Sequence, residues 1–315
     1  MTINSPSAIW PELHYAEWAG TCEAIHLWTQ IVGKVRLAQT RWLNHSWQTP
    51  LYVTSRGLST GPIPHQHRYF DIEFDFVTHV LRLRSDTKEI ALPLEAMSVA
   101  AFYDQVIGAL DALGTPVSIF AAPNEMPEAT PFSQDTRIRE YDPVYAHKFW
   151  RVLLQTDQVF KTFRTGFLGK ASPVHFFWGS FDLAVTRFSG RKAPLHPGGI
   201  PHLPDAVVRE AYSHEVSSAG FWPGNPGDAA FYSYVYPEPA GFREKKVLPA
   251  TAFFDTTLRE FLLPYEEMRK AADPDAALMD FLTSTYAAAA DTANWDRAAL
   301  ECGIGHPGRP RQVAE

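Results

Sequence analysis

Cysteine is scarce in this sequence, and the only two, Cys22 and Cys302, lie at opposite ends of the chain. There is also no run of about 18 apolar residues, the length that indicates a membrane-spanning helix. The first residues, Met1 to Pro11, lack the basic and then apolar order of a secretory signal. These absences argue against a disulfide framework and predict a protein of the reducing cytoplasm with no membrane partner.

Basic residues are outnumbered, because 28 Lys and Arg stand against 35 Asp and Glu and give a net charge of −7. A general nucleic-acid binder needs a basic surface to displace counterions, so nucleic acid is not an expected partner. With 45% hydrophobic residues over 315 positions, the composition is that of a globular protein with a sizeable core.

Familiar cofactor motifs are missing as well. The sequence contains no phosphate-cradling glycine loop and no Gly-x-Ser-x-Gly elbow. His65 and His67 have the spacing of two metal ligands on one strand face, but no third or fourth ligand is evident, and an exposed loop pair is the preferred interpretation. The sequence therefore predicts no metal site and identifies no cofactor.

The clearest pattern that is present is an alternation of apolar and acidic residues over positions 69–77. Positions 80–84 alternate leucine with arginine in the same way. With Thr78-His79 as a hairpin loop, Phe76 lies opposite Leu81, and the acids lie opposite the arginines. The pattern predicts a hairpin with one apolar face and one ion-paired face.

Helix-start signals organise the rest of the chain. Ser98 suits an N-cap and Gly114 a helix end, while Asp142 and Asp273 each precede a proline, which is tolerated at the first helical position. We expect helices over residues 21–39, 98–113, 142–165 and 273–290. We expect further strands over residues 47–56, 117–121, 174–187, 212–222, 230–236 and 251–256.

These elements predict an α+β fold with two similar halves, each in the order helix, strand, strand, strand, helix, and each with an antiparallel sheet. The chain is expected to form one unit over 1–315, with an N-terminal half at 12–122, a C-terminal half at 133–298 and a flexible tail at 303–315.

An internal duplication is one interpretation of this repeated order. Trp47 and Arg56 are nine positions apart, as are Trp178 and Arg187, so the two predicted strands can be overlaid without a gap. Chance agreement is the alternative, because the spacing between helix and strand differs in the two halves.

The strand predicted over 174–187 carries the most unusual set of side chains. By parity, Trp178, Ser180 and Asp182 share one face, and His175 and Arg187 share the other. The first face suits a binding site with an aromatic stacking platform. A half-exposed strand with solvated polar groups is the alternative.

His214 and Glu215 form a second candidate, although neighbours on a strand point to opposite faces. Histidine titrates near neutrality and is a natural acid or base, while a hydrogen-bonded core histidine is the other interpretation. Arg56 and Arg187 each end a predicted strand, directly before a loop. They suit either an anion clamp or a structural role on loop carbonyls.

Four stretches carry a resemblance: WTQIVGKVR at 28–36, PLYVTSRGL at 50–58, the segment 173–191 and REAYSHEVSSAGFWPG at 209–224. They resemble a mostly bacterial family of about 300 residues that is described only as a domain of unknown function. The resemblance extends from Trp10 to about Trp295. It implies one family-defining unit, and it implies no activity, cofactor or catalytic residue.

Two functions are compatible with these residues. The first is a small-molecule site, binding or catalytic, in a cleft between the halves. Its candidate catalytic residues are His214, Glu215, His175 and Asp182, and its candidate ligand-binding residues, for a ligand of negative charge, are Trp47, Arg56, Trp178, Ser180 and Arg187. The alternative is a non-catalytic module that binds a partner protein or a second copy through the aromatic strand 231–236. Convergence of the candidate residues on one concave surface would favour the first.

Overall fold

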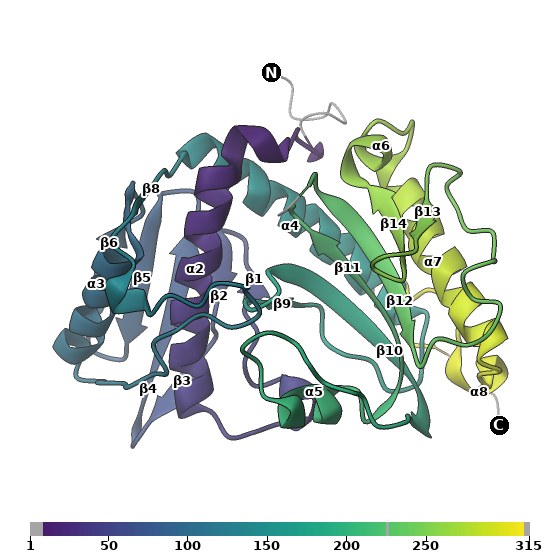
Figure 1. Cartoon of the computed structure of the whole chain (residues 1–315), viewed down its shortest axis with the longest axis horizontal. Helices are drawn as coiled ribbons and strands as arrows, with labels where there is room; N and C mark the ends of the chain where they lie inside the picture. The colour runs from purple at the N-terminus through teal and green to yellow at the C-terminus, as the bar shows by residue number, and fades with distance from the viewer. Residues whose placement is uncertain (1–8, 225–226, 312–315) are drawn as a thin grey trace.

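The computed structural model describes residues 9–224 and 227–311 and contains two large antiparallel β-sheets (Figure 1). The first sheet consists, in spatial order, of β1 (Tyr52–Val53), β2 (Gly57–Ser59), β4 (Arg68–Asp75), β5 (Val80–Ser85) and β6 (Glu89–Pro93), with β3 (Ile63–His65) also paired to β4. The second consists of β13 (Phe253–Asp255), β14 (Glu260–Pro264), β12 (Ala230–Tyr236), β11 (His214–Trp222), β10 (Asp182–Lys192) and β9 (His175–Phe177). A small ribbon pairs β7 (Met97–Ser98) with β8 (Ile138–Arg139).

The two large sheets meet edge to edge at Leu51, which precedes β1, and Phe176 of β9. Each residue donates its backbone N–H to the carbonyl oxygen of the other, at 2.9 and 2.8 Å. Both side chains are fully buried. The junction places the first half of the chain directly beside the strands that carry the candidate site residues.

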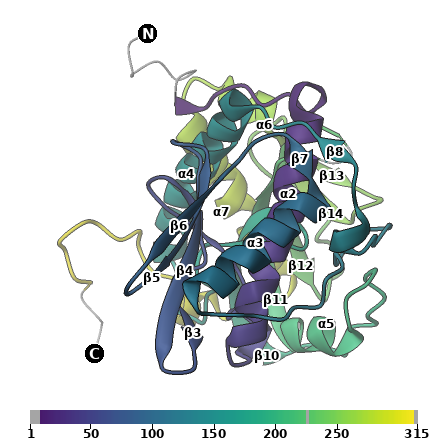
Figure 2. The ribbon, with the colours of Figure 1, turned by 90° about the vertical axis from the view of Figure 1, so that its left-hand side faces the viewer.

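Helices cover the sheets unevenly, as the two views show (Figures 1 and 2). The longer helices are α2 (Tyr15–Gln39), α3 (Val99–Leu113), α4 (Pro143–Thr165) and α7 (Pro274–Thr292), and the shorter ones are α5 (Asp205–Ala211), α6 (Tyr265–Arg269), α8 (Arg297–Leu300) and the 3₁₀ turns η1 (Asn44–Ser46) and η2 (Phe132–Gln134). α2 and α3 pack on the first sheet, and α4 and α7 pack on one face of the second. The other face of the second sheet is left to α5 and the end of α2. The predicted α+β class is confirmed.

Three of the four predicted helix starts are confirmed by their caps, whereas α2 begins at Tyr15, six residues before the predicted start at Thr21. The Ser98 hydroxyl accepts a hydrogen bond from Ala101 N, and Gly114 ends α3 in the left-handed conformation at φ 77°. The Asp142 and Asp273 carboxylates accept hydrogen bonds from the first-turn N–H groups of α4 and α7, and each is followed by proline. These short-range hydrogen bonds fix where both helices begin.

The hairpin of β4 and β5 forms, but its predicted register is wrong by two residues. Phe74, not Phe76, pairs with Leu81, and the turn is longer than Thr78-His79. The cause is Asp75, whose carboxylate accepts hydrogen bonds from the backbone N–H groups of Val77 and Thr78, in the middle of the turn 76–79, at 3.0 Å each. A shift of two preserves the faces, so the predicted apolar and ion-paired sides are retained.

Three strand predictions are wrong in extent. The segment 174–187 bends into β9 and β10, because residues 178–181 form a turn in which Phe181 has a φ of 60°. In 47–56 only β1 is extended, and 117–121 forms no strand. The overlay of the two Trp-to-Arg strands therefore does not hold, while the internal duplication stays a prediction.

A single cluster of buried apolar side chains runs through both halves, from Trp28 and Phe74 to Phe149 and Phe231. No helix within residues 9–224 and 227–311 is long and apolar enough to cross a membrane. In the tail predicted as flexible, residues 303–311 form no helix or named strand, although Gly305 N donates to the Thr165 hydroxyl at 2.9 Å. Residues 312–315 of that tail lie outside the described residues.

Candidate functional site

A cavity of about 1090 Å³ lies on the face of the second sheet that is turned away from α4 and α7. Its walls are the end of α2, the loop that follows it, the connector segment 120–125, and α5 with the loop before it (Figure 1). It is therefore bounded by both halves of the chain. Its volume lies just above the roughly 300–1,000 Å³ that is common for small-molecule sites.

Alternate residues of β10 form the floor of this cavity: Asp182, Ala184, Thr186 and Phe188. A strand advances about 3.3 Å per residue, so these four side chains span about 20 Å. The intervening residues face the opposite way, and Arg187 packs its guanidinium 3.5 Å from the Phe163 ring of α4. The floor is thus long, with an acid at one end and an aromatic ring at the other.

Asp182 is the fixed polar point of the floor. It is only 6% exposed and accepts hydrogen bonds from the hydroxyls of Ser180 and Tyr232. Tyr232 stands two strands away on β12, so its ring leans across β11 at Gly220, where a Cβ would lie 2.3 Å from the phenol oxygen. Burial raises the pKa of Asp182, and the two hydrogen bonds oppose that shift. Glycine at position 220 is what allows the contact.

Glu125 brings a second acid to the same end. It lies in the connector with a φ of 59°, and its N–H donates to the Pro201 carbonyl at 3.0 Å. A Cβ on Gly179, in the β9–β10 turn, would lie 2.0 Å from Glu125 Oε1, so this carboxyl group rests on the turn that precedes Asp182. Burial, and then the charge of Asp182, raise the pKa of Glu125 to about 7, against the effect of Lys34.

Lys34, on α2, lines the cavity beside these acids and acts on Glu125 through its charge. Burial lowers its pKa to about 8, while Glu125 acts in the opposite direction. Its Nζ lies 5.5 Å from the centre of the Trp178 ring and donates to the Asn124 side chain. Trp178 is held in turn by its indole N–H, which donates to Thr49 O at 3.0 Å. The Lys34 amine and the Trp178 ring therefore lie side by side in the cavity wall.

Glu260, on β14, is the third acid of the lining. Burial raises its pKa to about 7, helped by the charges of Asp182 and Asp255. In the described part of the chain, no side-chain hydrogen bond or ion pair reaches the carboxyl group of Glu125 or Glu260. Both acids therefore keep their acceptor capacity for a ligand or water.

Hydroxyl groups continue the polar floor between the acids and the far end. The hydroxyls of Thr186 and Ser218 lie 2.9 Å apart across β10 and β11. Those of Tyr212 and Tyr234 lie 2.8 Å apart. The floor thus offers hydrogen bonds along its length, while most of the remaining walls are aromatic or aliphatic.

His175 also lines the cavity, beside Ala184 in the register of β9 and β10. It is 1% exposed, and within the described ranges neither ring nitrogen has a hydrogen-bond partner. Burial lowers its pKa to about 4, so the imidazole is neutral at pH 7. A neutral imidazole offers one donor and one acceptor.

At the aromatic end, His45 is fully engaged by the protein. Its Nδ1 lies 2.9 Å from the Ala211 carbonyl and its Nε2 lies 2.6 Å from Lys170 Nζ. Because lysine can only donate, Nε2 accepts and Nδ1 carries the proton. This histidine is therefore a neutral part of the wall.

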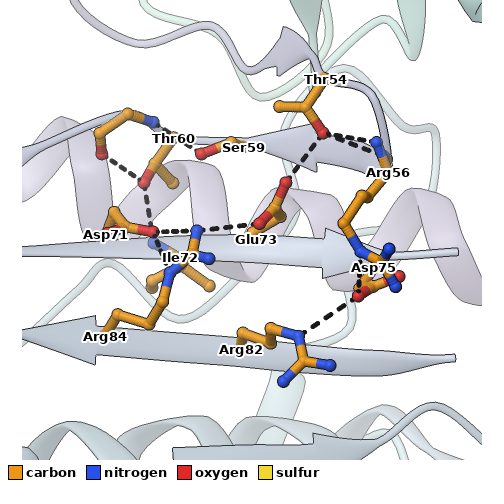
Figure 3. Close-up of polar contacts among 12 residues, drawn as sticks. Thr54, Arg56, Ser59, Thr60, Asp71, Ile72, Glu73, Asp75, Arg82 and Arg84 are labelled. Carbon is orange, nitrogen blue, oxygen red and sulfur yellow. Dashed lines mark hydrogen bonds and ion pairs between the residues drawn. The ribbon is translucent and has the colours of Figure 1, made fainter. Parts of the chain in front are cut away.

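The other cluster of charges lies on the first sheet and is satisfied internally (Figure 3). Arg84 pairs with Asp71 and Glu73 at 2.7 and 2.8 Å, and Arg82 pairs with Asp75 at 3.2 Å. The predicted pairing of these acids with arginines is confirmed. Within the described residues, no group of three or more His, Cys, Asp or Glu is arranged to hold a metal ion.

A comparison with protein families gives one match, a "Family of unknown function (DUF5996)", over residues 10–302. The chain belongs to the DUF5996 family. The resemblance of the four sequence stretches to a domain of unknown function that covers nearly the whole chain is thereby confirmed. No curated protein and no solved structure matches the chain, so neither comparison names a function for this DUF5996 member.

In this DUF5996 member, part of the predicted residue set meets at the cavity. The residues that line it are Trp47, His175, Trp178, Ser180 and Asp182. They come from the loop after α2 and from the β9–β10 region, which the junction of the two sheets brings together. The turn at 178–181 reverses the chain, which is why His175 and Asp182 share a face although the sequence parity separates them.

The other predicted residues lie elsewhere in the DUF5996 fold. Arg56 pairs with Asp75 on the first sheet, and Arg187 faces α4, where it donates to the Phe163 carbonyl. Glu215 pairs with Arg191 at 2.7 Å. His214 does not line the cavity, although its ring lies edge-on to His45 with 6.4 Å between centres. The two arginines are thus not placed to act together on one ligand.

Sequence reasoning missed the residues that complete the acidic end: Lys34, Glu125, Tyr232 and Glu260. Tyr232 and Tyr234 carry a signal, because their alternation in 231–236 predicts that both face the same way. Glu125 carries no such sequence signal. It lies in a proline-rich connector whose path is set by contacts with segments far away in the sequence.

Proposed function

We propose that this protein binds a small organic molecule in the cavity, with an apolar or aromatic body along the floor and a polar head at Asp182. The observation that carries the proposal is a cavity of about 1090 Å³ whose floor holds a buried carboxylate fixed by Ser180 and Tyr232. A few fixed polar groups within a mainly apolar pocket are typical of small-molecule sites.

The shape supports an elongated ligand. The floor runs about 20 Å from Asp182 to Phe188. Trp178 and Phe177 form one side of the lining, and Tyr232 and Tyr234 form the other. Aromatic rings contribute large contact areas that do not need to reorganise on binding, since each ring has only two rotatable bonds.

The alternative function, a protein-interaction module, requires the aromatic strand 231–236 to present an exposed surface. Strand β12 lies between β11 and β14, with Phe231 and Val235 buried. Tyr232 and Tyr234 face the cavity. The aromatic strand is therefore occupied within the sheet, and we base no second function on it.

The test is a ligand screen on the wild type and on Ala184→Phe. Ala184 lies on the floor between Asp182 and Thr186, so a benzyl group there fills the slot. We expect some amphipathic aromatic compounds to raise the Tm of the wild type by several degrees and to leave that of Ala184→Phe unchanged. Binding stabilises the folded state by RT ln(1 + L/Kd), where L is the ligand concentration, so the rise in Tm grows with the logarithm of ligand concentration once that concentration exceeds Kd.

The matched control is Ala91→Phe, the same change at an exposed position on β6. This variant should respond as the wild type does. If Ala184→Phe does not fold, Thr186→Phe replaces it, since both side chains stand on the same floor. Equal stabilisation of the wild type and the blocked variant, or no stabilisation by any such compound, would overturn the proposal.

A further inference from the structure

We propose that the ligand of this cavity carries a positive charge, and that its ammonium or related group is held at the acidic end between Asp182, Glu125 and Glu260. This inference rests on the proposed function, because it names the chemical class of the molecule that occupies the same site. It concerns the head group only and leaves the body of the ligand as described above.

The charges that line the cavity favour this class. Three carboxyl groups come from the connector, β10 and β14, whereas one lysine, Lys34, and no arginine belongs to the lining within the described residues. Lys34 offsets the charge of one of the three. Glu125 and Glu260 keep acceptor sites that no described side chain occupies. A cationic head with several N–H donors matches this surplus of acceptors.

A second feature points to a ligand independently of the acids. His175 is buried at 1% exposure on the cavity floor, yet both ring nitrogens lack partners in the part of the chain that the structure describes. A buried polar group without a hydrogen bond costs roughly 1–3 kcal/mol, so such groups are normally paired. Both nitrogens have almost no accessible surface, so a ligand on the floor would supply the missing partner once the ring turns toward the cavity.

The protein's own amine shows how the walls accept a cation. The Lys34 ammonium lies 5.5 Å from the Trp178 ring centre and 5.4 Å from that of Phe120. Cations are attracted to the faces of aromatic rings within about 6 Å. Tyr232 and Tyr234, stacked at 6.0 Å between ring centres, extend the aromatic lining beyond Asp182.

Cation binding at this position is coupled to proton release. Glu125 faces Lys34 and Asp182, and Glu260 faces Asp182 and Asp255. Burial raises the pKa of both glutamates to about 7, so each is partly protonated at neutral pH. A bound cation favours the carboxylate form and expels the proton. Affinity for a cation therefore rises with pH, by up to about tenfold for each glutamate between pH 6 and pH 8.

The experiment compares three probes with the same body: phenylbutylamine, phenylbutanol and phenylbutyrate. Isothermal titration of the full-length protein is run at pH 6 and pH 8, in buffers of different ionisation enthalpy, which reports the protons released. We expect the amine to bind at least tenfold more tightly than the alcohol at pH 8. We expect the carboxylate to bind most weakly, and the amine alone to release protons.

The variants Asp182→Asn and Glu260→Gln keep the shape of the side chains and remove a charge. Each should weaken amine binding about tenfold or more while leaving binding of the alcohol within about twofold. The matched control is Glu89→Gln, an exposed acid on β6 of the other sheet, which should bind all three probes as the wild type does.

The outcomes separate the two proposals. If all three probes bind alike, or the carboxylate binds best, and Ala184→Phe abolishes that binding, the cavity is a ligand site but its ligand is not a cation. If the amine binds equally well to Ala184→Phe, the contacts lie outside the cavity and both proposals fail.

Discussion

At the scale of single residues, two glycines determine the shape of the cavity. Gly220 lets Tyr232 cross β11 to Asp182, and Gly33 lets the Trp178 indole lie against α2. A Cβ on Gly33 would stand 2.2 Å from that indole. Neither position has a positive φ, so the need for glycine is one of space and not of backbone conformation.

Gly33→Ala should therefore destabilise the protein although it lies inside a helix. Glycine to alanine normally stabilises a helix by about 1 kcal/mol. Displacing a packed indole costs about 1–3 kcal/mol and exceeds that gain. Urea unfolding checks the sign. Gly108→Ala in α3, where the added methyl meets open space, is the control and should gain stability. A stabilised Gly33→Ala would show that the indole moves freely.

At the scale of elements, the β4–β5 hairpin is held by one carboxylate. The Asp75 side chain has no exposed surface, accepts two turn N–H groups and contacts both Arg56 and Arg82, at 2.7 and 3.2 Å (Figure 3). These hydrogen bonds hold the pKa of Asp75 well below its ordinary value, against the effect of burial. The turn and the ion-paired face thus depend on the same ionised group.

Asp75→Asn should cost about 1.5–3 kcal/mol at pH 7, the range for hydrogen bonds to a charged group. Because the folded-state pKa is depressed, the stabilisation is complete above the unfolded-state pKa of about 4 and is lost as pH falls below it. Urea unfolding between pH 7 and pH 3 should show a smaller loss on acidification in the variant. Asp86→Asn, an exposed acid, is the control. Parallel pH curves for wild type and Asp75→Asn would contradict this role.

The elements that local chemistry determines could be predicted from the sequence. Ser98 and Asp142 are bonded within one helical turn, so their helices start where the residues predict. The faces of β4 and β5 follow from alternation. The register of the two strands does not follow from alternation, because a pairing shifted by two residues matches the same alternating pattern. The register depends instead on the turn that Asp75 closes.

The candidate site was less predictable because distant segments build it. Asp182 and Trp178 stand out in one stretch of sequence, yet the chain reverses within it at residues 178–181, and the Gly179-Ser180 pair is the local signal of that turn. Glu125 reaches the cavity through hydrogen bonds of its neighbour Asn124 to Gln30, 94 residues earlier. Such contacts are decided by tertiary packing and leave no local pattern.

At the scale of the whole molecule, the two halves are tied together across the cavity. The indole of Trp178 rests on Gly33, and the Trp150 indole N–H donates to Thr54 O at 3.0 Å. The sheets share the Leu51–Phe176 pair. The halves are thus predicted to act as one folding unit.

Cutting the connector should therefore not release the halves. A protease site inserted after Pro127, in an exposed stretch, can be cleaved without touching these contacts. We expect the two pieces to co-elute in size-exclusion chromatography and to unfold in one transition. The uncut wild type treated with the same protease is the control. Pieces that separate in buffer would contradict the shared core.

The pairing of Leu51 with Phe176 has a further consequence for self-association. An open sheet edge is a template on which a second chain can add a strand. Here the inner edges, β1 and β9, are joined at this pair, and the outer strands of the joined sheets are β6, which contains Pro93, and β13, while β3 is a further edge strand paired to β4. A substitution that separates this one pair exposes two apolar strand edges at once. Each exposed edge can then pair with another chain, and aggregation follows.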